Sequence, residues 1–462
     1  MGLTSDLNVS VQSLLANTEG MDITSTNMAN MNTSGYARRV MVQEESPPTG
    51  IDQSSTGVDV KAIQSMRDTV LDLSIDANTS QQNLNDTVAS SLSEVQTAFS
   101  DSSSGGIGSS IDSFFSALQE LSTSPTSASL RSDALTDAGN VASAFQSTAS
   151  VITQARQQAD QSVVNDTSDA NSLLQQIATT NQRIAAAQAQ GQDSNSDEDQ
   201  LSGLLTKLSA IMDFKTVNSS DGLTLTTADG VPLVVGNTAY ALSNQTNSNG
   251  YNDVYAGGTD ITSNIEGGSL GGYIQTRDQT LSTMSTQLDD FAYQFAEAVN
   301  NVQTAGDDAD GNPGTALFDP PDTTSGTTTG AASSIAVALT SGSQIAAAAS
   351  GGASGDSSNL TKMLALQNDT VIDGSTPAQA FSNLSFTVGN TISQAQSNAT
   401  ASGNIITQLK NQQSSVEGVS IDEETSNLLL YQRSYQAAAK VISTVDTLMG
   451  NVLDMGVSNP GY

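Results

Sequence analysis

The chain has 462 residues, which is enough for about three domains of average size. Its 14 Lys and Arg residues against 48 Asp and Glu residues give a net charge of −34, which argues against nucleic acid and anionic membrane surfaces as partners. The absence of His and Cys excludes Ser-His-Asp triads, Cys nucleophiles, disulfides and zinc sites built from those ligands. The catalytic chemistry that these absences still allow is acid–base work by carboxylates, a Ser-Lys pair or an oxygen-ligated cation. Because so little catalytic chemistry remains, an enzyme is disfavoured.

Residues 1–60 predict a helix, a turn and a strand. Apolar side chains at steps of three or four include Leu7, Leu14, Met21 and Met28, as expected for an amphipathic helix. The helix is expected to stop in the Asn-rich stretch that ends at Gly35, and residues 36–45 have strand character. Residues 1–20 lack a basic start and an unbroken apolar core, so no cleaved signal peptide is predicted. No apolar run approaches about 18 residues, so no membrane insertion is predicted.

The middle of the chain changes from helical to strand-like character. Residues 61–213 predict a long helical body, starting near residue 62 and interrupted by a Ser/Gly loop at 101–110 and a polar, acidic break at 191–199. Residues 214–268 contain β-branched runs separated by Asp-Gly and Gly-Asn pairs, which predict hairpins in an inserted β domain.

Helical periodicity returns in residues 269–417, the second half of the body, and is most regular in residues 418–462. The final segment has apolar positions in alternating steps of three and four, typical of a coiled-coil seam. These positions are Leu428, Tyr431, Tyr435, Ala438, Ile442, Val445, Met449 and Val452. We therefore expect an elongated, multi-domain, mainly α fold with an inserted all-β domain, whose terminal helices pair as a coiled coil.

Two terminal motifs carry a family resemblance. Residues 27–39 read NMANMNTSGYARR, residues 55–60 read STGVDV, and residues 418–450 begin GVSIDEE. Together with GGSLGGYIQTRD at 267–278, these segments resemble the flagellar hook-associated protein 1 family, the first junction proteins between bacterial hook and filament. The Asn-rich core is shared with rod and hook proteins, whereas Arg38 and the Asp-Glu-Glu opening are closer to the junction family.

The resemblance implies a structural role in flagellum assembly and motility. Proteins of this family are exported by the flagellar type III apparatus without cleavage, and they assemble as a ring at the hook–filament junction outside the cell. The implied partners are hook protein, the second junction protein, further copies of the chain and a cytosolic export chaperone on the C-terminal region.

The predicted assembly interface combines the two apolar stripes with the N-terminal turn. We expect Asn27, Asn30 and Gly35 to end the helix and form a turn that positions Tyr36 and Arg38 for neighbours. Burial of the eight seam side chains stabilises the C-terminal helix by less than the cost of ordering its backbone, so we expect both ends to become ordered against a partner. The predicted interface comprises Leu7, Leu14, Met21, Asn27, Met28, Asn30, Gly35, Tyr36, Arg38, Leu428, Tyr431, Tyr435, Ile442, Val445, Met449 and Val452.

Other interpretations stay open at this point. The terminal stripes are also compatible with an ordinary helix pair in a globular core. Another axial protein (hook, rod or filament subunit) and a surface adhesin on an axial scaffold are the alternative functions. An EF-hand at residues 306–317 fails, because Gly306 and Leu317 occupy the two outer ligand positions, so an acidic turn is expected there. No catalytic residue, cofactor or metal site is predicted.

Overall fold

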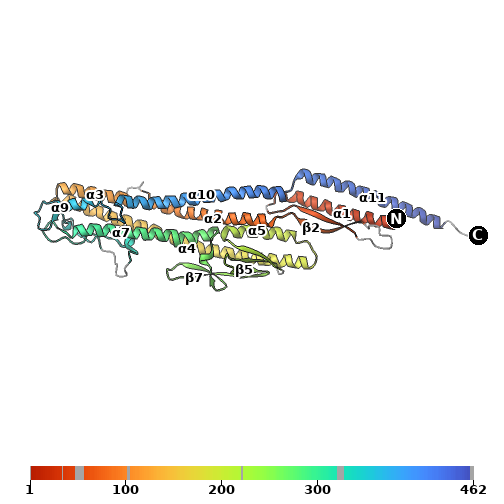
Figure 1. Cartoon of the computed structure of the whole chain (residues 1–462), viewed down its shortest axis with the longest axis horizontal. Coiled ribbons are helices and arrows are strands. Elements are labelled where there is room, and N and C mark those ends of the chain that lie inside the picture. Colours follow the sequence, from red (N-terminus) through yellow and green to blue (C-terminus); the bar gives the residue numbers. More distant parts are fainter. Residues whose placement is uncertain are drawn as a thin grey trace, which may run out of the picture. The chain divides into compact units, whose positions relative to one another are not determined.

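The structure is a computed structural model that describes residues 2–33, 35–46, 57–100, 105–219, 222–319 and 327–457. Ser55 and Thr56 of the STGVDV motif and the last five residues of the segment 418–462 lie outside these ranges. The described chain is mainly helical with small antiparallel sheets in its middle, which confirms the predicted fold class (Figure 1). Throughout the described ranges, every helix falls short of the length and apolarity that a bilayer crossing demands.

Two compact units divide the chain. The first comprises residues 1–79, 170–241 and 402–462, and the second comprises 80–169 and 242–401. The first unit thus brings together both ends of the chain and part of its middle. The division of the chain into five segments stays a prediction.

The first unit contains the paired chain ends. Helix α1 (Leu3–Asn30) leads into the antiparallel hairpin of β1 (Arg39–Glu45) and β2 (Val58–Ser65), and helix α11 (Ile421–Val457) packs along α1 (Figure 1). Strand β2 corrects the expected start of the helical body at residue 62, because residues 62–65 pair with β1 and α2 (Thr69–Ala98) begins only after Asp68. The Asp68 carboxylate accepts hydrogen bonds from the backbone N–H groups of Val70 and Leu71, which makes it the N-cap.

The acidic break predicted at 191–199 is shorter in the structure. Helix α4 (Ala128–Ala189) ends before it, but helix α5 (Asn195–Ile211) already begins at Asn195. Asp197 and Glu198 lie in the first turn of α5, where negative charge interacts favourably with the helix dipole. The prediction of a break through Asp199 was therefore wrong at its C-terminal end.

The predicted β region forms two sheets. Strands β3 (Lys215–Ser219), β4 (Gly222–Thr226), β5 (Pro232–Val235) and β6 (Thr238–Ala239) form one sheet, which belongs to the first unit. Strands β7 (Leu242–Thr246), β8 (Asn252–Ala256) and β9 (Thr259–Asp260) form another, which belongs to the second. All neighbouring strands are antiparallel, as hairpin connections require.

The second unit surrounds an apolar core. Its remaining elements are α3 (Ile107–Thr123), η1 (Thr262–Asn264), α6 (Gly268–Gln275), the π-helical turn η2 (Thr276–Thr280), α7 (Leu281–Gln303), β10 (Gly306–Asp307), α8 (Ala331–Ser334), η3 (Gly342–Gln344), β11 (Ala348–Ala349) and α9 (Ser358–Ala365). Helix α10 (Pro377–Glu417) starts in this unit and ends in the first. The core holds a cluster of phenylalanine rings around Phe295, from α3, α4 and α7 and from Phe318.

The predicted acidic turn is present in the second unit. The Asp308 carboxylate accepts hydrogen bonds from the backbone N–H groups of Asp310 and Asn312. These bonds hold the pKa of Asp308 below its usual range, against the opposing effect of burial. Gly311 has φ +81°, a left-handed conformation that favours glycine at this point of the turn.

Candidate assembly interface

Small side chains line the face of α1 that is most deeply buried. Gly20 lies directly beneath the Tyr431 ring of α11, so closely that a Cβ atom at Gly20 would come within 2.7 Å of that ring. The buried residues of α1 are Ser10, Ala16, Gly20, Ile23, Thr24 and Asn27. Small residues let two helices approach closely, because the distance between helix axes depends on the side chains at the contact.

The hydroxyl groups on this face are satisfied within the helix. Ser10 donates to the Asp6 carbonyl oxygen at 2.7 Å, and Thr24 donates to the Gly20 carbonyl oxygen at 2.8 Å. A buried hydroxyl costs free energy chiefly when it lacks a partner. These bonds therefore make a polar, small-residue face compatible with burial against α11.

The predicted apolar stripe of α1 lies elsewhere on the helix. Leu7, Leu14, Met21 and Met28 are half-buried, and the neighbouring Leu15 is 67% exposed. At about 100° per residue, this stripe is roughly a third of a turn away from the small-residue face. The helix thus buries one face inside the chain and leaves another partly exposed.

The predicted seam of helix α11 is likewise buried at some positions and exposed at others. Ala438 and Val445 are buried, whereas Leu428, Tyr431, Ile442 and Met449 are half-buried. Tyr435 is 40% exposed and Val452 is 53% exposed. The same helix exposes Leu429, Leu430, Val441 and Leu448. Much of its apolar surface is therefore uncovered in the single chain.

The N-terminal motif places its side chains around Asn27. The Asn27 side-chain oxygen accepts hydrogen bonds from the Tyr36 hydroxyl at 2.7 Å and from the Arg39 backbone N–H at 3.0 Å. Its amide nitrogen donates to the Arg39 carbonyl oxygen and to Glu424. Burial raises the pKa of Tyr36, although the charge of Arg39 opposes this shift, so the phenol stays protonated and can donate. Asn27 thereby fixes the turn after α1.

Asn30 and Gly35 form the turn as predicted from the sequence. The Asn30 amide donates to the Thr26 carbonyl oxygen, and its side-chain oxygen accepts from the Thr33 hydroxyl. Gly35 has φ +81°, in the left-handed region that glycine adopts without a steric penalty. The turn returns the chain towards β1.

Arg38 connects the N-terminal motif to the C-terminal one. Its guanidinium pairs with Glu424 at 2.8 Å and with Glu423 at 3.0 Å, and its backbone N–H donates to the Glu417 carbonyl oxygen. Glu424 is 2% exposed. We call Asn27, Tyr36, Arg38, Glu423 and Glu424 the polar latch. It explains why the two terminal motifs occur in one chain, since their side chains bind each other.

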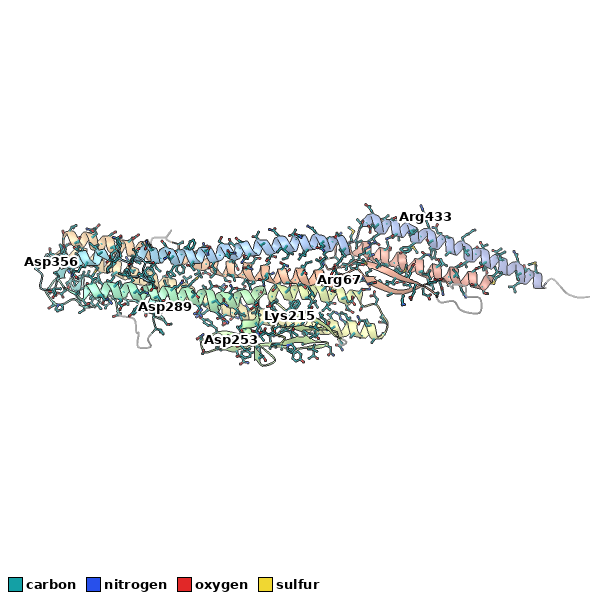
Figure 2. All side chains as sticks on the ribbon, in the orientation of Figure 1. Arg67, Lys215, Asp253, Asp289, Asp356 and Arg433 are labelled. Carbon is teal, nitrogen blue, oxygen red and sulfur yellow. The ribbon has the colours of Figure 1, made fainter. Side chains whose placement is uncertain are left out.

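A second ionic cluster, beside the latch, was missed by sequence reasoning. Arg67 pairs with Asp72 and Asp199, both at 2.7 Å, and Arg39 pairs with Asp199 at 3.0 Å. Burial acts to lower the pKa of Arg67, but the hydrogen bonds to Asp199 and Asp72 outweigh it and the pKa is raised. A cleft of about 670 Å³ adjoins this cluster, lined by residues of the first unit that include Arg67 and Lys410. Figure 2 labels Arg67.

The one feature of the sequence that pointed to this ionic cluster was the small number of basic side chains, 14 in the whole chain. A buried arginine needs acceptors that the sequence does not identify, either carboxylates, as for Arg67, or backbone carbonyls, as for Arg131. Asp199 lies in a stretch that reads as a polar break, and its pairing with Arg39 and Arg67 depends on how α5 packs. Only the assembled fold brings these three residues together.

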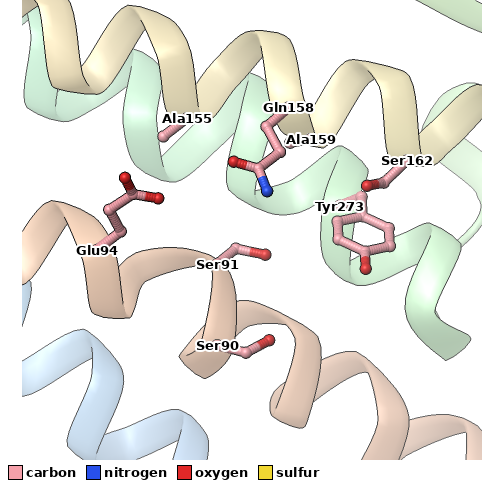
Figure 3. Close-up of a pocket in the computed structure, with 8 residues that line it drawn as sticks. All are labelled: Ser90, Ser91, Glu94, Ala155, Gln158, Ala159, Ser162 and Tyr273. Carbon is pink, nitrogen blue, oxygen red and sulfur yellow. The ribbon is translucent and has the colours of Figure 1, made fainter.

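A groove in the second unit is lined by hydroxyl groups rather than by ion pairs. It measures about 230 Å³, and Figure 3 shows hydroxyls of Ser90, Ser91, Ser162 and Tyr273 around it, with Glu94 and Gln158. Glu94 is the one charged side chain among the residues that line it. Nucleophilic catalysis needs a base beside the nucleophile and a further group that orients the base, an arrangement that these lining residues do not provide.

Comparisons with known proteins find similarity to flagellar hook-associated and rod proteins. Residues 92–318 match the family described as flagellar hook-associated protein FlgK helical domain, and residues 412–455 match the C-terminal region of flagellar basal body rod FlgEFG proteins. Flagellar hook-associated protein 1 of Bacillus subtilis is 27% identical, covering 96% of this chain and 97% of its own length. The Salmonella typhimurium protein of the same name is 26% identical, covering 98% of this chain and 100% of its own length.

A solved structure supports the fold. The flagellar hook junction protein FlgK from Burkholderia pseudomallei superposes with a TM-score of 0.67 at 18% identity, covering 75% of this chain and 100% of that one. The resemblance predicted from the terminal motifs is confirmed.

Proposed function

This chain is a relative of the flagellar hook-associated protein 1 family, and we propose that it joins the flagellar hook to the filament through its terminal helices. The observation that carries this proposal is the α1–α11 pair. One face of the pair is closed inside the chain by small residues and the polar latch, while apolar residues such as Leu15 and Leu430 remain exposed. Exposed apolar surface of this kind is typical of protein–protein interfaces.

The pair provides a surface for neighbouring axial subunits. We infer that copies of the chain associate as a ring, and that hook protein and the second junction protein bind next to that ring. In this arrangement Tyr435 and Val452, which the single chain leaves exposed, pack against a neighbour. The predicted residues Leu7, Leu14, Met21 and Met28 contribute the α1 side of that contact.

The same surface needs protection before assembly. We propose that a cytosolic export chaperone binds the C-terminal region and covers the apolar residues of α11 until export. Export without a cleaved signal peptide then delivers the chain to the hook–filament junction outside the cell. Burial of exposed apolar side chains is the physical reason for such a partner.

The proposed role is mechanical rather than enzymatic. The polar latch and the Arg67 cluster consist of charges that are paired or hydrogen-bonded, as expected for groups that hold elements together. We therefore assign no catalytic residue.

Val445→Asp tests the proposed function. Val445 is 5% exposed, so an aspartate there places a carboxylate without a partner in the α1–α11 contact and separates the helices. We expect soluble protein that is lost from the hook–filament junction, measured by immunogold labelling of intact flagella. Ser443→Asp is the matched control, because Ser443 is exposed on the same helix. Normal incorporation of Val445→Asp would contradict the proposal.

A second candidate function is a rod or hook subunit. The match of residues 412–455 to rod proteins favours it, because that segment is most of α11. Long filaments formed by the purified chain alone would support this candidate, whereas growth that ends at a ring would support the junction role.

A further inference from the structure

The middle of helix α11 carries the opposite charge to helix α1. Helix α1 has no Lys or Arg, and its charged residues are Asp6, Glu19 and Asp22. The basic residues of α11 are Arg433 and Lys440, and both are exposed. Arg433 is labelled in Figure 2. The acids of α11 lie towards its ends, at Asp422, Glu423, Glu424, Asp446 and Asp454. The stretch 425–445 between them is therefore cationic, whereas α1 is entirely acidic.

These charges are unpaired in the single chain. Among the residues that the structure describes, no ion pair or hydrogen bond engages the side chains of Arg433, Lys440, Glu19 or Asp22. By contrast, Arg38, Arg39 and Arg67 of the same unit are all paired with carboxylates. In a chain with a net charge of −34, these two basic groups without an acidic partner are available to bind carboxylates of another copy.

Apolar residues accompany the charges. On α1, Val11 is 41% exposed and Leu15 is 67% exposed, and their spacing from Asp22 places all three on one side of the helix. On α11, Leu430 is 60% exposed and Val441 is 46% exposed, close to Arg433 and Lys440 in the sequence. Each helix therefore presents a mixed apolar and charged surface.

The register of the α1–α11 pair places Glu19 of α1 and Arg433 of α11 at nearly the same position along the axis of the pair. Gly20 lies beneath Tyr431, and Asn27 bonds to Glu424, so the two helices run antiparallel. Glu19 precedes Gly20 by one residue and Arg433 follows Tyr431 by two, which places them within about one helical turn along the pair. By the same register, Val11 is level with Val441.

We propose that the outward surface of α11 docks onto α1 of a second copy at the same level, with Arg433 bound to Glu19 and Asp22 of that copy. Val441 then packs near Val11 of the neighbour, and the apolar residues bury each other while the ion pairs set the height at which copies meet. Electrostatic complementarity chiefly provides register and partner choice in such contacts. This inference rests on the proposed function, to which it adds a specific copy-to-copy pairing.

Charge reversal tests the pairing in cells that produce only the variant chain. Arg433→Glu should lose most of its incorporation at the hook, because it faces two carboxylates of the neighbour. Adding Glu19→Lys and Asp22→Lys to that variant should restore incorporation. Lys362→Glu, which makes the same charge change at an exposed site in the second unit, is the control and should assemble normally. Normal assembly of Arg433→Glu, or no restoration in the triple variant, would overturn the pairing.

Cross-linking tests the geometry with the charges in place. The chain has no Cys, so two co-produced variants with one cysteine each, Thr18→Cys and Ala437→Cys, allow a single kind of mixed dimer. Both positions are exposed and flank the proposed ion pairs. A short thiol-reactive cross-linker should give that dimer in isolated hooks, and Thr18→Cys with Lys362→Cys should not. Incorporated protein without the dimer would overturn the pairing but leave the junction role, whereas absence of the unaltered chain from hooks would refute the junction role itself.

Discussion

The core of the second unit and the terminal helix pair of the first bury different kinds of side chain. The core packs aromatic rings against each other, with Phe114, Phe115, Phe145 and Phe318 around Phe295. The terminal pair has no phenylalanine, and its buried face on α1 consists mostly of small and polar residues. The core therefore encloses its apolar surface, whereas the pair leaves much of its own exposed.

This difference separates stability from assembly. A side chain such as Phe295, enclosed by its own unit, contributes to folding whether or not other subunits are present. An exposed residue such as Leu430 gains its burial only from a neighbour. Substitutions in the core should thus act on unfolding, and substitutions of the exposed residues of the pair should act mainly on assembly.

The largest effect should come from Phe295→Ala. Phe295 is 1% exposed, and truncation leaves a cavity among the surrounding rings that costs about 3–5 kcal/mol. Chemical denaturation should report this loss. Phe386→Ala removes the same atoms from a side chain that is 72% exposed in the same unit and should change the free energy of unfolding by less than about 0.5 kcal/mol. Equal losses in both variants would contradict the assignment of the core.

A smaller effect, of opposite sign, is expected from Asp76→Asn in the first unit. Burial raises the pKa of Asp76 to about 6, although a hydrogen bond from Thr206 opposes the shift. Because this pKa lies above the ordinary value of 3.8, the bound proton stabilises the fold at low pH, and that contribution is lost as the pH rises through about 6. At pH 7 the asparagine variant should gain about 2–3 kcal/mol.

The midpoint of thermal unfolding between pH 4 and 8 measures this gain. The unaltered chain should lose stability towards pH 8, and Asp76→Asn should flatten that dependence. Asp86→Asn, an exposed position on the same helix, should leave it unchanged. A flat profile in the unaltered chain would disprove the role of Asp76.

The smallest effect should come from Gly20→Ala in the terminal pair. The added Cβ would lie 2.7 Å from the Tyr431 ring, so the ring or the helix must shift, at a cost of about 1–3 kcal/mol. Gly450→Ala on α11 is the matched control, because nothing lies within 4 Å of its added Cβ and alanine favours the helix. Helix content measured by circular dichroism during thermal unfolding should fall earlier for Gly20→Ala alone.

Much of the candidate site was predictable because short-range chemistry determines it. The Asn-rich stretch and Gly35 predicted a helix end and a turn, and Asn27, Asn30 and Gly35 form it. The motifs also singled out Arg38 and the Asp-Glu-Glu segment, although not their mutual pairing. Asp199 could not be predicted, because nothing in the local sequence distinguishes it from the neighbouring acids Asp193, Asp197 and Glu198.

By itself the sequence determined most of the helices, turns and hairpins, since periodicity, capping residues and glycine act over a few neighbouring positions. The starts of α2 and α5 are the exceptions described above. It also determined that both ends are amphipathic. Tertiary structure decided which side of each terminal helix faces the other: α1 buries Gly20 and Ala16 rather than the stripe of Leu7 and Leu14. The physical reason is that hydrophobicity favours burial against any partner, whereas close approach of two helices depends on small side chains that match across the contact.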